Sequence, residues 1–323
     1  MNRRTLLGSV VLLSTVATRT RADEWPSRPI TLIVPLAAGS TADIFARIVG
    51  TELGKALGAT FVVQDRPGGA GNIGMEMAAH ATPDGYTIVV GTNGQLAINV
   101  GLFAKLPFDP VNDFTPIMPT VESFNGLIVP NASPAHSVAE LVELAKTKPG
   151  GLNYSSGGIG TTHHLSAALF CSQAGIDAVH VPYKGAPEGI DGVMANQVAF
   201  GFFNLPNIVP LAKADQLRVL AVTGAHRSSL LPGIPTMQES GFPNYETSVW
   251  FGIYAPAGVP GPITDKLRVA LSNLMREPTF AVRMEELGFE VMPVLTPPES
   301  VQFLKAEITK WVQIVRLSGA KAE

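Results

Sequence analysis

The sequence has little cysteine, little charge and few aromatic residues. Cys171 is its single cysteine, which excludes a disulfide within one chain, and no CxxC or His/Cys spacing suited to a metal is present. Of the 323 residues, 15% are charged and 7% are aromatic, whereas 46% are hydrophobic. This is the composition of a globular protein that is large enough for two domains with cores of their own. A disulfide-rich scaffold is excluded, and we expect no bound metal.

Long apolar runs are also missing, because no segment reaches the roughly 20 apolar residues that a membrane helix needs. A shorter run at residues 6–17 follows Arg3 and Arg4 and precedes residues 20–22, an order that is typical of a secretory signal peptide. The beginning of this segment also resembles a twin-arginine signal, and no lipobox cysteine follows it. We therefore predict a signal peptide over residues 1–22 and a mature protein that is soluble in the periplasm.

Positive charge is scarce in the predicted mature chain. Removal of residues 1–22 takes away four arginines and no acidic residue, so the net charge falls from −3 to −7. A protein that binds nucleic acid or an anionic membrane surface needs the opposite balance. We expect neither partner.

What the sequence does contain is a distinctive stretch at residues 29–47. Residues 30–34 predict a strand buried on both faces. A loop of small residues from Leu36 to Thr41 follows, and then an amphipathic helix with Ser40 or Thr41 as its N-cap. Such a unit directs unpaired N–H groups and a partial positive charge at one point, which favours an anion. An ordinary capped turn is the alternative.

A second copy of this arrangement lies at residues 152–169. Strand 152–154 leads into a Gly/Ser loop that ends at Thr161 and Thr162, and a helix containing His164 follows. Further strands are predicted at 61–63, 86–90, 127–129, 179–181, 198–203, 217–223 and 250–255, and helices at 72–79, 138–146, 263–275, 279–287 and 298–317. We did not find a sequence repeat beyond the paired loops.

The alternation of strands and helices predicts parallel sheets with helices on their faces. Functional residues of such sheets gather where strands end, which here means Leu36–Thr41 and Thr92–Gly94, with Asn204 closing the strand at 198–203. We predict two α/β lobes. Residues 23–125 together with 240–323 form the first lobe, and residues 126–239 form the second.

Three other motifs in the sequence bear on function. Residues 69–74 match GxGxxG, but the next strand ends in Gly91-Thr92 instead of the acid that holds a ribose, so we favour a tight turn and expect no cofactor. His163 and His164 point about 100° apart on a helix and cannot both serve one site, and no GxSxG elbow is present. Lys184 follows an apolar strand and pairs either with a ligand anion or with a carboxylate of the scaffold.

A set of segments runs in order along the predicted mature chain and comprises residues 35–43, 66–74, 83–87, 155–165, 181–185, 217–223, 235–236 and 250–252. Together these segments resemble the Bug family, the periplasmic solute receptors of tripartite tricarboxylate transporters. The resemblance implies a periplasmic binding protein of the type II-like, Venus flytrap form, in which each lobe is a mostly parallel sheet flanked by helices. Departures from the family pattern at Ser40, Ala42, Ala168 and Ala199 leave the identity of the ligand open.

The resemblance also implies a ligand and a partner. A small carboxylate, which is a di- or tricarboxylate, an acidic amino acid or an aromatic acid, would bind between the lobes and pass to inner-membrane transporter subunits, with the receptor acting as a monomer. From the strand ends and the resemblance together, the predicted ligand-binding residues are Leu36, Ala38, Gly39, Ser40, Thr41, Asp43, Thr92, Asn93, Gly157, Gly160, Thr161, Thr162, His164, Lys184 and Asn204.

An exported enzyme that acts on a small carboxylic acid in the same cleft is the alternative function. An enzyme needs a titratable pair close to the small-residue loops, and the sequence places only Asp43 there. We therefore predict a receptor without catalytic residues, in which Asp43 either takes part in ligand selection or serves as a helix-start acid.

Overall fold

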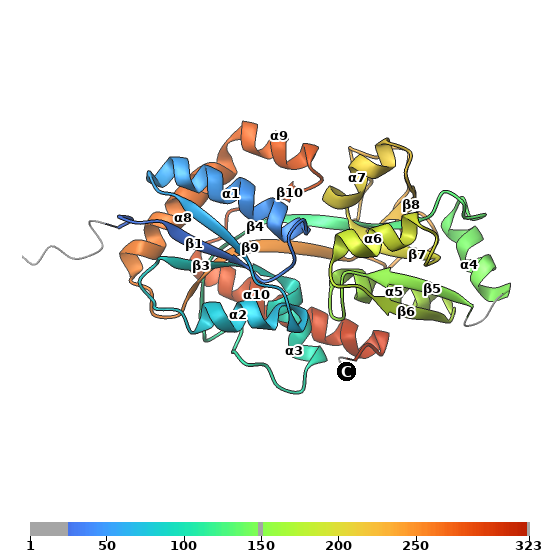
Figure 1. The fold of residues 1–323 in the computed structure, drawn as a ribbon, viewed down its shortest axis with the longest axis horizontal. Helices are drawn as coiled ribbons and strands as arrows, with labels where there is room; N and C mark the ends of the chain where they lie inside the picture. The colour runs from blue at the N-terminus through green and yellow to red at the C-terminus, as the bar shows by residue number, and fades with distance from the viewer. Residues whose placement is uncertain (1–24, 148–150, 322–323) are drawn as a thin grey trace, which may run out of the picture.

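The computed structural model describes residues 25–147 and 151–321. The predicted signal peptide lies outside the described residues. The chain forms two α/β lobes that lie side by side and are joined by long strands (Figure 1). The predicted fold class, two lobes that are each built on a sheet flanked by helices, is confirmed.

The first lobe is built on three parallel strands that are extended by two antiparallel ones. β1 (Ile30–Val34) pairs in parallel with β2 (Phe61–Asp65) on one side and with β3 (Thr87–Thr92) on the other. β9 (Ser248–Pro256) then runs antiparallel to β3, and β4 (Phe114–Val129) runs antiparallel to β9. Strand β1 is almost fully buried, as its apolar sequence predicts.

Helices cover both faces of this sheet. α1 (Thr41–Leu57), α8 (Gly261–Arg276) and α9 (Pro278–Glu286) lie on one face, and α2 (Asn72–Ala79), α3 (Asn99–Leu102) and α10 (Pro297–Ser318) lie on the other (Figure 1). The short turns η1 (Gly69–Gly71) and η2 (Gly94–Ile98) and the strand β10 (Glu290–Val291) complete this lobe.

The second lobe repeats the plan with a shorter sheet. β5 (Leu152–Ser156) pairs in parallel with β6 (Ala178–Pro182) and with β7 (Phe200–Asn204). β7 and β8 (Arg218–Val222) both pair antiparallel with the end of β4. The helices of this lobe are α4 (Val138–Thr147), α5 (Thr162–Ala174), α6 (Ala186–Met194) and α7 (Leu205–Lys213).

β4 is the strand that joins the lobes. Residues 114–124 pair with β9 in the first sheet, whereas Asn125 is already paired with Asn204 in the second. The sequence predicted only the last three residues of this strand, because Pro116 and Pro119 interrupt its pattern. The structure accommodates both prolines where the register with β9 shifts, as prolines within a sheet require.

The return of the chain to the first lobe comes later than predicted. Phe242 and Tyr245 pack in the hydrophobic core of the second lobe, and Thr247 N–H still donates to Thr223 of that lobe. Val249 is the first residue after them to join the core of the first lobe. We therefore place the return at Thr247–Ser248 and correct the predicted boundary at 240, which followed the turn composition after Pro232.

Within the described ranges, none of the helices has both the length and the apolar character that crossing a membrane requires.

Candidate functional site

A narrow cavity of about 50 Å³ lies between the lobes. Its lining is drawn from the ends of β3 and β7, from the first turns of several helices and from the crossing strand β9. The lining residues are Leu36, Ala37, Ser40, Thr41, Ala42, Thr92, Asn93, Gly94, Gln95, Gly157, Thr161, Thr162, His163, Lys184, Gly185, Ala186, Asn204, Val249 and Phe251. Among these described residues there is no Asp or Glu, and Lys184 is the single cation.

Four helices begin at this cavity. α1 and α5 start behind the N-caps Ser40 and Thr161, and α6 and α7 start behind Gly185 and Asn204. Gly185 has no side chain, and the side chain of Asn204 makes no capping hydrogen bond, so neither residue caps the first N–H groups of its helix. Pro187 and Pro206 in these first turns have no N–H, which leaves the N–H groups of their neighbours as the donors there. Each helix also contributes a partial positive charge. Four such ends around a cavity without a carboxylate give the electrostatic setting that favours an anion.

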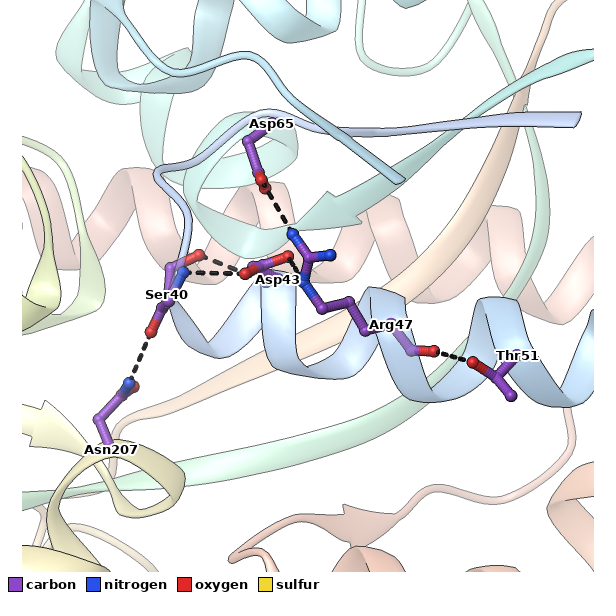
Figure 2. Close-up of polar contacts among 7 residues, drawn as sticks. Ser40, Asp43, Arg47, Thr51, Asp65 and Asn207 are labelled. Atoms are coloured by element: carbon purple, nitrogen blue, oxygen red, sulfur yellow. Dashed lines mark hydrogen bonds and ion pairs between the residues drawn. The ribbon is translucent and has the colours of Figure 1, made fainter. Parts of the chain in front are cut away.

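The first loop is held by an ion-pair network (Figure 2). The Asp43 carboxylate accepts from Gly39 N–H at 2.8 Å and pairs with Arg47 Nε at 2.6 Å. Arg47 reaches on to Asp65, at 3.3 Å. Burial raises the pKa of Asp65, and the nearby Asp43 charge adds to this rise while Arg47 opposes it. The network fixes Gly39, whose φ of +74° suits glycine.

The second loop is held by neutral groups. Thr161 Oγ1 accepts from His164 N–H at 3.3 Å and donates to the Gly158 carbonyl at 2.8 Å. His163 Nδ1 accepts from Gly157 N–H at 3.3 Å, so its Nε2 carries the proton and donates to Asn204 Oδ1 at 2.8 Å. Burial lowers the pKa of His163 to about 4. His163 is therefore neutral near pH 7 and locked in one tautomer.

His164 points away from the cavity. Its Nδ1 accepts from Gly160 N–H at 3.2 Å, and its ring stacks on His180 with 4.0 Å between centroids. His180 stacks on Tyr154 with its other face. Burial, together with the nearby charge of His180, lowers the pKa of His164 to about 3, and burial lowers the pKa of His180 to about 4. The stack supports the loop from behind.

Side chains of the second lobe reach across to the first loop. Asn207 Nδ2 donates to the Gly39 carbonyl at 3.0 Å (Figure 2). The Thr41 hydroxyl lies within hydrogen-bond reach of Asn207 Oδ1 and, at 3.3 Å, of Asn204 Oδ1. Asn204 in turn donates to Asn125 of β4 at 2.8 Å. These contacts tie the two lobes together at the mouth of the cavity.

A wider and more open chamber of about 720 Å³ adjoins the cavity. Leu36, Ala37, Gly157, Thr161 and Lys184 line both spaces, so Lys184 stands at their boundary. The GxGxxG segment borders the chamber with Gly69 and Gly71, and packing explains two of its glycines. A Cβ on Gly71 would lie 2.6 Å from Gln95, and one on Gly74 would lie 2.8 Å from Pro35.

Ten of the fifteen predicted residues line the cavity. They are Leu36, Ser40, Thr41, Thr92, Asn93, Gly157, Thr161, Thr162, Lys184 and Asn204. Ala38, Gly39, Asp43, Gly160 and His164 do not line it. Gly39 and Gly160 shape their loops through positive φ, and Asp43 and His164 bind those loops from the side that faces away from the cavity. Asp43 therefore supports the site without contacting its interior.

The sequence prediction missed His163, Gln95 and the first turns of α6 and α7. Gln95 Oε1 accepts from Thr92 at 2.7 Å and its Nε2 donates to Ala70, which anchors the floor of the cavity. Adjacent histidines on one helix give no sequence signal that tells which of them faces inward. The short motif Lys184-Gly185-Ala186-Pro187 did contain a signal, since proline is favoured in the first turn of a helix.

The fold and the site together define a two-lobed solute-binding protein whose cleft suits a small anion. The chain belongs to the family described as tripartite tricarboxylate transporter family receptor, which matches residues 45–319. The resemblance to Bug receptors is thereby confirmed, and the chain is a solute-binding receptor of this family of periplasmic proteins.

Curated relatives match over nearly the whole chain. Protein BugT of Bordetella pertussis is 29% identical over 98% of this chain and 97% of its own length. The UPF0065 protein in the gbd 5′ region of Cupriavidus necator is 31% identical over 96% of this chain and 94% of its own length.

Solved structures agree closely. Rpa4515 of R. palustris with adipate superposes with a TM-score of 0.89 at 35% identity, covering 92% of this chain and 99% of that one. MatC from Rhodopseudomonas palustris with bound malate gives 0.85 at 29% identity, covering 90% and 100%. The periplasmic binding protein BugD gives 0.87 at 30% identity, covering 93% and 100%.

Proposed function

We propose that the mature protein is a periplasmic receptor that binds a small carboxylate between its lobes and delivers it to a tripartite transporter in the inner membrane. The convergence of four helix N-termini on a cavity whose described lining holds no acid carries this proposal. Ten residues predicted from the sequence as ligand-binding form part of this lining, and we propose them, together with His163, as the binding residues.

Neutral donors suffice for useful affinity. A hydrogen bond to a charged group contributes about 1.5–3 kcal/mol net, and a helix N-terminus contributes up to about 2 kcal/mol in a buried setting. Two loops that each supply such contacts reach micromolar affinity, near −8 kcal/mol. Lys184 at the boundary of the outer chamber adds a positive charge that meets the ligand as it enters.

The family relatives support the ligand class. One related structure holds adipate and another holds malate, and both compounds are small dicarboxylates. We propose a carboxylate of this size for the present chain. We further propose that the receptor acts as a monomer, which size-exclusion chromatography with light scattering tests directly.

An enzyme is the weaker alternative. Ser156 Oγ lies 2.7 Å from His180 Nε2, which is the kind of contact that activates a nucleophile. However, neither residue lines the cavity, and His180 is held between two stacked rings. Of the two buried histidines, His163 is engaged on both nitrogens, and His164 accepts from Gly160 N–H and does not line the cavity. These contacts are structural, and a receptor needs no base.

A thermal-shift screen of the mature protein against di- and tricarboxylates, acidic amino acids and aromatic acids tests the proposal. We expect at least one carboxylate to raise the melting temperature and to bind in calorimetry with a micromolar Kd. A matched panel of uncharged amides of the same acids should leave the melting temperature unchanged. If no carboxylate binds, or if the amides bind equally well, the proposed function is wrong.

Delivery is tested in cells. Deletion of the gene should abolish uptake of the identified carboxylate at micromolar concentration, and fractionation should recover the mature protein from the periplasm. Retention of the protein in the inner membrane after a carbonate wash contradicts the proposed location, and normal uptake in the deletion strain contradicts the transport role.

A further inference from the structure

Asn93 on the wall of the cavity has an acceptor with no partner. The residue is fully buried, and its Nδ2 donates to the carbonyl of Ser248 on the crossing strand, at 2.8 Å. Only the amide nitrogen can donate to a carbonyl, so the orientation of the amide group is fixed and Oδ1 lies on the opposite side. No donor of the described residues lies within hydrogen-bond reach of Oδ1.

Other polar side chains of the cavity wall do have partners. The Thr92 hydroxyl donates to Gln95, the Thr161 hydroxyl donates to Gly158, and His163 donates to Asn204. Buried acceptors in folded proteins are almost always satisfied, and an unsatisfied one costs free energy. Since Asn93 borders the cavity, the guest of the cavity is the natural source of the missing donor.

The charges that line the cavity indicate which group of a ligand can donate to Asn93 Oδ1. An ammonium group would need a carboxylate nearby, yet the described lining has none, and Asp43 is turned away toward Arg47 and Gly39. Lys184 would repel an ammonium group as well. A neutral hydroxyl has neither difficulty and donates one proton.

We propose that the ligand is a small hydroxycarboxylate whose hydroxyl group donates to Asn93 Oδ1. This inference rests on the proposed function, which supplies the carboxylate, and adds the substituent that the carboxylate carries. It assigns Asn93 as the residue that distinguishes hydroxy acids from the same acids without the hydroxyl, and it excludes acidic amino acids as the preferred guests.

Matched ligand pairs test the inference on the mature protein. Calorimetry compares malate with succinate, 2-hydroxyglutarate with glutarate and mandelate with phenylacetate, so that the members of each pair differ by one hydroxyl. In at least one pair that binds, the hydroxylated member should bind about three- to tenfold more tightly, the range of one neutral hydrogen bond. Aspartate should bind no more tightly than succinate.

Variants assign the preference to Asn93. In Asn93→Ala, the ratio of the Kd values of the unsubstituted and the hydroxylated ligand should fall to about one, whatever the effect of the substitution on the affinity for both. Asn93→Asp keeps the shape and the acceptor but loses the donor to Ser248 and adds a negative charge, so every carboxylate should bind more weakly. The hydroxyl preference should persist, while aspartate should gain relative to succinate. Asn99→Ala is the matched control, because Asn99 is fully buried and also has an unpartnered Oδ1 but does not line the cavity. In Asn99→Ala, the ratio of the Kd values within a ligand pair should equal that of the wild type.

The outcomes are separable from those of the proposed function. If carboxylates bind the wild type but no hydroxyl tightens any pair, or if the preference survives in Asn93→Ala, the hydroxyl inference is wrong and the receptor proposal stands. If no carboxylate binds at all, the receptor proposal fails first.

Discussion

The two loops that line the cavity look alike in the sequence but are supported in opposite ways. The loop at Gly39–Thr41 depends on charge, since Asp43 joins it to Arg47 and Arg47 to Asp65. The loop at Gly157–Thr161 depends on neutral rings, since His163 and His164 accept from its backbone and His180 stacks on His164. The same strand–loop–helix unit is thus supported by ion pairs in one lobe and by neutral rings in the other.

This difference teaches that the residue that caps a helix N-terminus and the contacts that hold the preceding loop in place are independent of each other. Ser40 and Thr161 accept from the N–H group three residues on in the same way. The groups that hold each loop in place differ between the lobes. The first lobe uses ion pairs that are partly exposed, because the Arg47 side chain is 57% exposed, whereas the second uses buried imidazoles that must stay neutral.

The largest expected difference between the two lobes is in their sensitivity to acid, because the buried histidines lie in the second lobe. The pKa of His163 is about 4 in the folded protein against about 6.5 in the unfolded chain, so the unfolded chain binds the proton first. The free energy of unfolding should therefore fall as the pH drops from about 6.5 to about 4, by about 3 kcal/mol for His163 alone. His164 and His180 should add to this loss. Urea unfolding at a series of pH values measures it.

Variants locate the acid effect in the second lobe. His180→Gln removes one of the stacked rings and should make the fall with pH shallower. His80→Gln changes an exposed histidine of the first lobe and should leave the curve as it is. A wild-type stability that stays level between pH 6.5 and 4.5 contradicts this account of the second loop.

Replacing Asp43 tests the support of the first loop. Asp43→Asn keeps the shape and removes the charge that binds Gly39 N–H and Arg47, so we expect a loss of about 2 kcal/mol in the free energy of unfolding. Because Asp43 does not line the cavity, the order in which the protein prefers its ligands should not change. Thermal melting and a ligand panel measure the two effects.

Asp65→Asn serves as the control for this network, because Asp65 contacts Arg47 at 3.3 Å and has no described contact with the loop. Its effect on stability should be the smaller of the two. An altered ligand order in Asp43→Asn, with amine-bearing ligands losing most, returns Asp43 to the site as a selectivity residue.

Asn207 tests the link between the two regions. It contacts Gly39 and Thr41 from the opposite lobe, so Asn207→Ala should weaken the closed arrangement and raise the Kd of every ligand by about tenfold, or 1.4 kcal/mol. Most of this change should appear in the dissociation rate, which stopped-flow fluorescence measures. The ratio between hydroxylated and unsubstituted ligands should stay constant.

Asn153→Ala is matched to this variant, because Asn153 makes two backbone contacts within the second lobe alone. It should lower stability without a change in dissociation rate. Equal dissociation rates in both variants and the wild type show that Asn207 does not tie the lobes.

The smallest effects should come from the two caps. Ser40→Ala and Thr161→Ala each remove a side-chain cap, which costs about 1 kcal/mol of stability and raises the Kd up to about tenfold. Thr161→Ala should cost more, since Thr161 also donates to the Gly158 carbonyl. Ser40→Thr and Thr161→Ser are conservative controls that keep the caps. Calorimetry that finds both alanine variants unchanged contradicts the role of the loops in binding.

Local signals in the sequence sufficed for these caps and for most of the strands. The run at 30–34 followed by small residues and Ser40 predicts β1 and α1, and the same signals at Thr161 predict α5. Each signal lies within a few residues of the structure that it determines, so no knowledge of tertiary packing is needed.

Features that depend on distant partners could not be predicted. Whether His163 or His164 faces the cavity depends on how α5 packs against β7 and on the position of Asn204. The role of Asp43 depends on whether Arg47 and Asp65 meet it, which follows from the pairing of β1 with β2. The full length of β4 could not be predicted, because its prolines are tolerated only where the register of its pairing with β9 shifts.

The discontinuous first lobe has a consequence for biosynthesis. β9, which covers the open edge of β3, and the helices α8 to α10 are all encoded after the entire second lobe. A ribosome releases the chain from its N-terminus, so β1 to β3 emerge long before their partners exist, while residues 126–247 can complete a core of their own. The sheet and helix layers of the first lobe therefore cannot be completed until β9 and α8 to α10 have been translated.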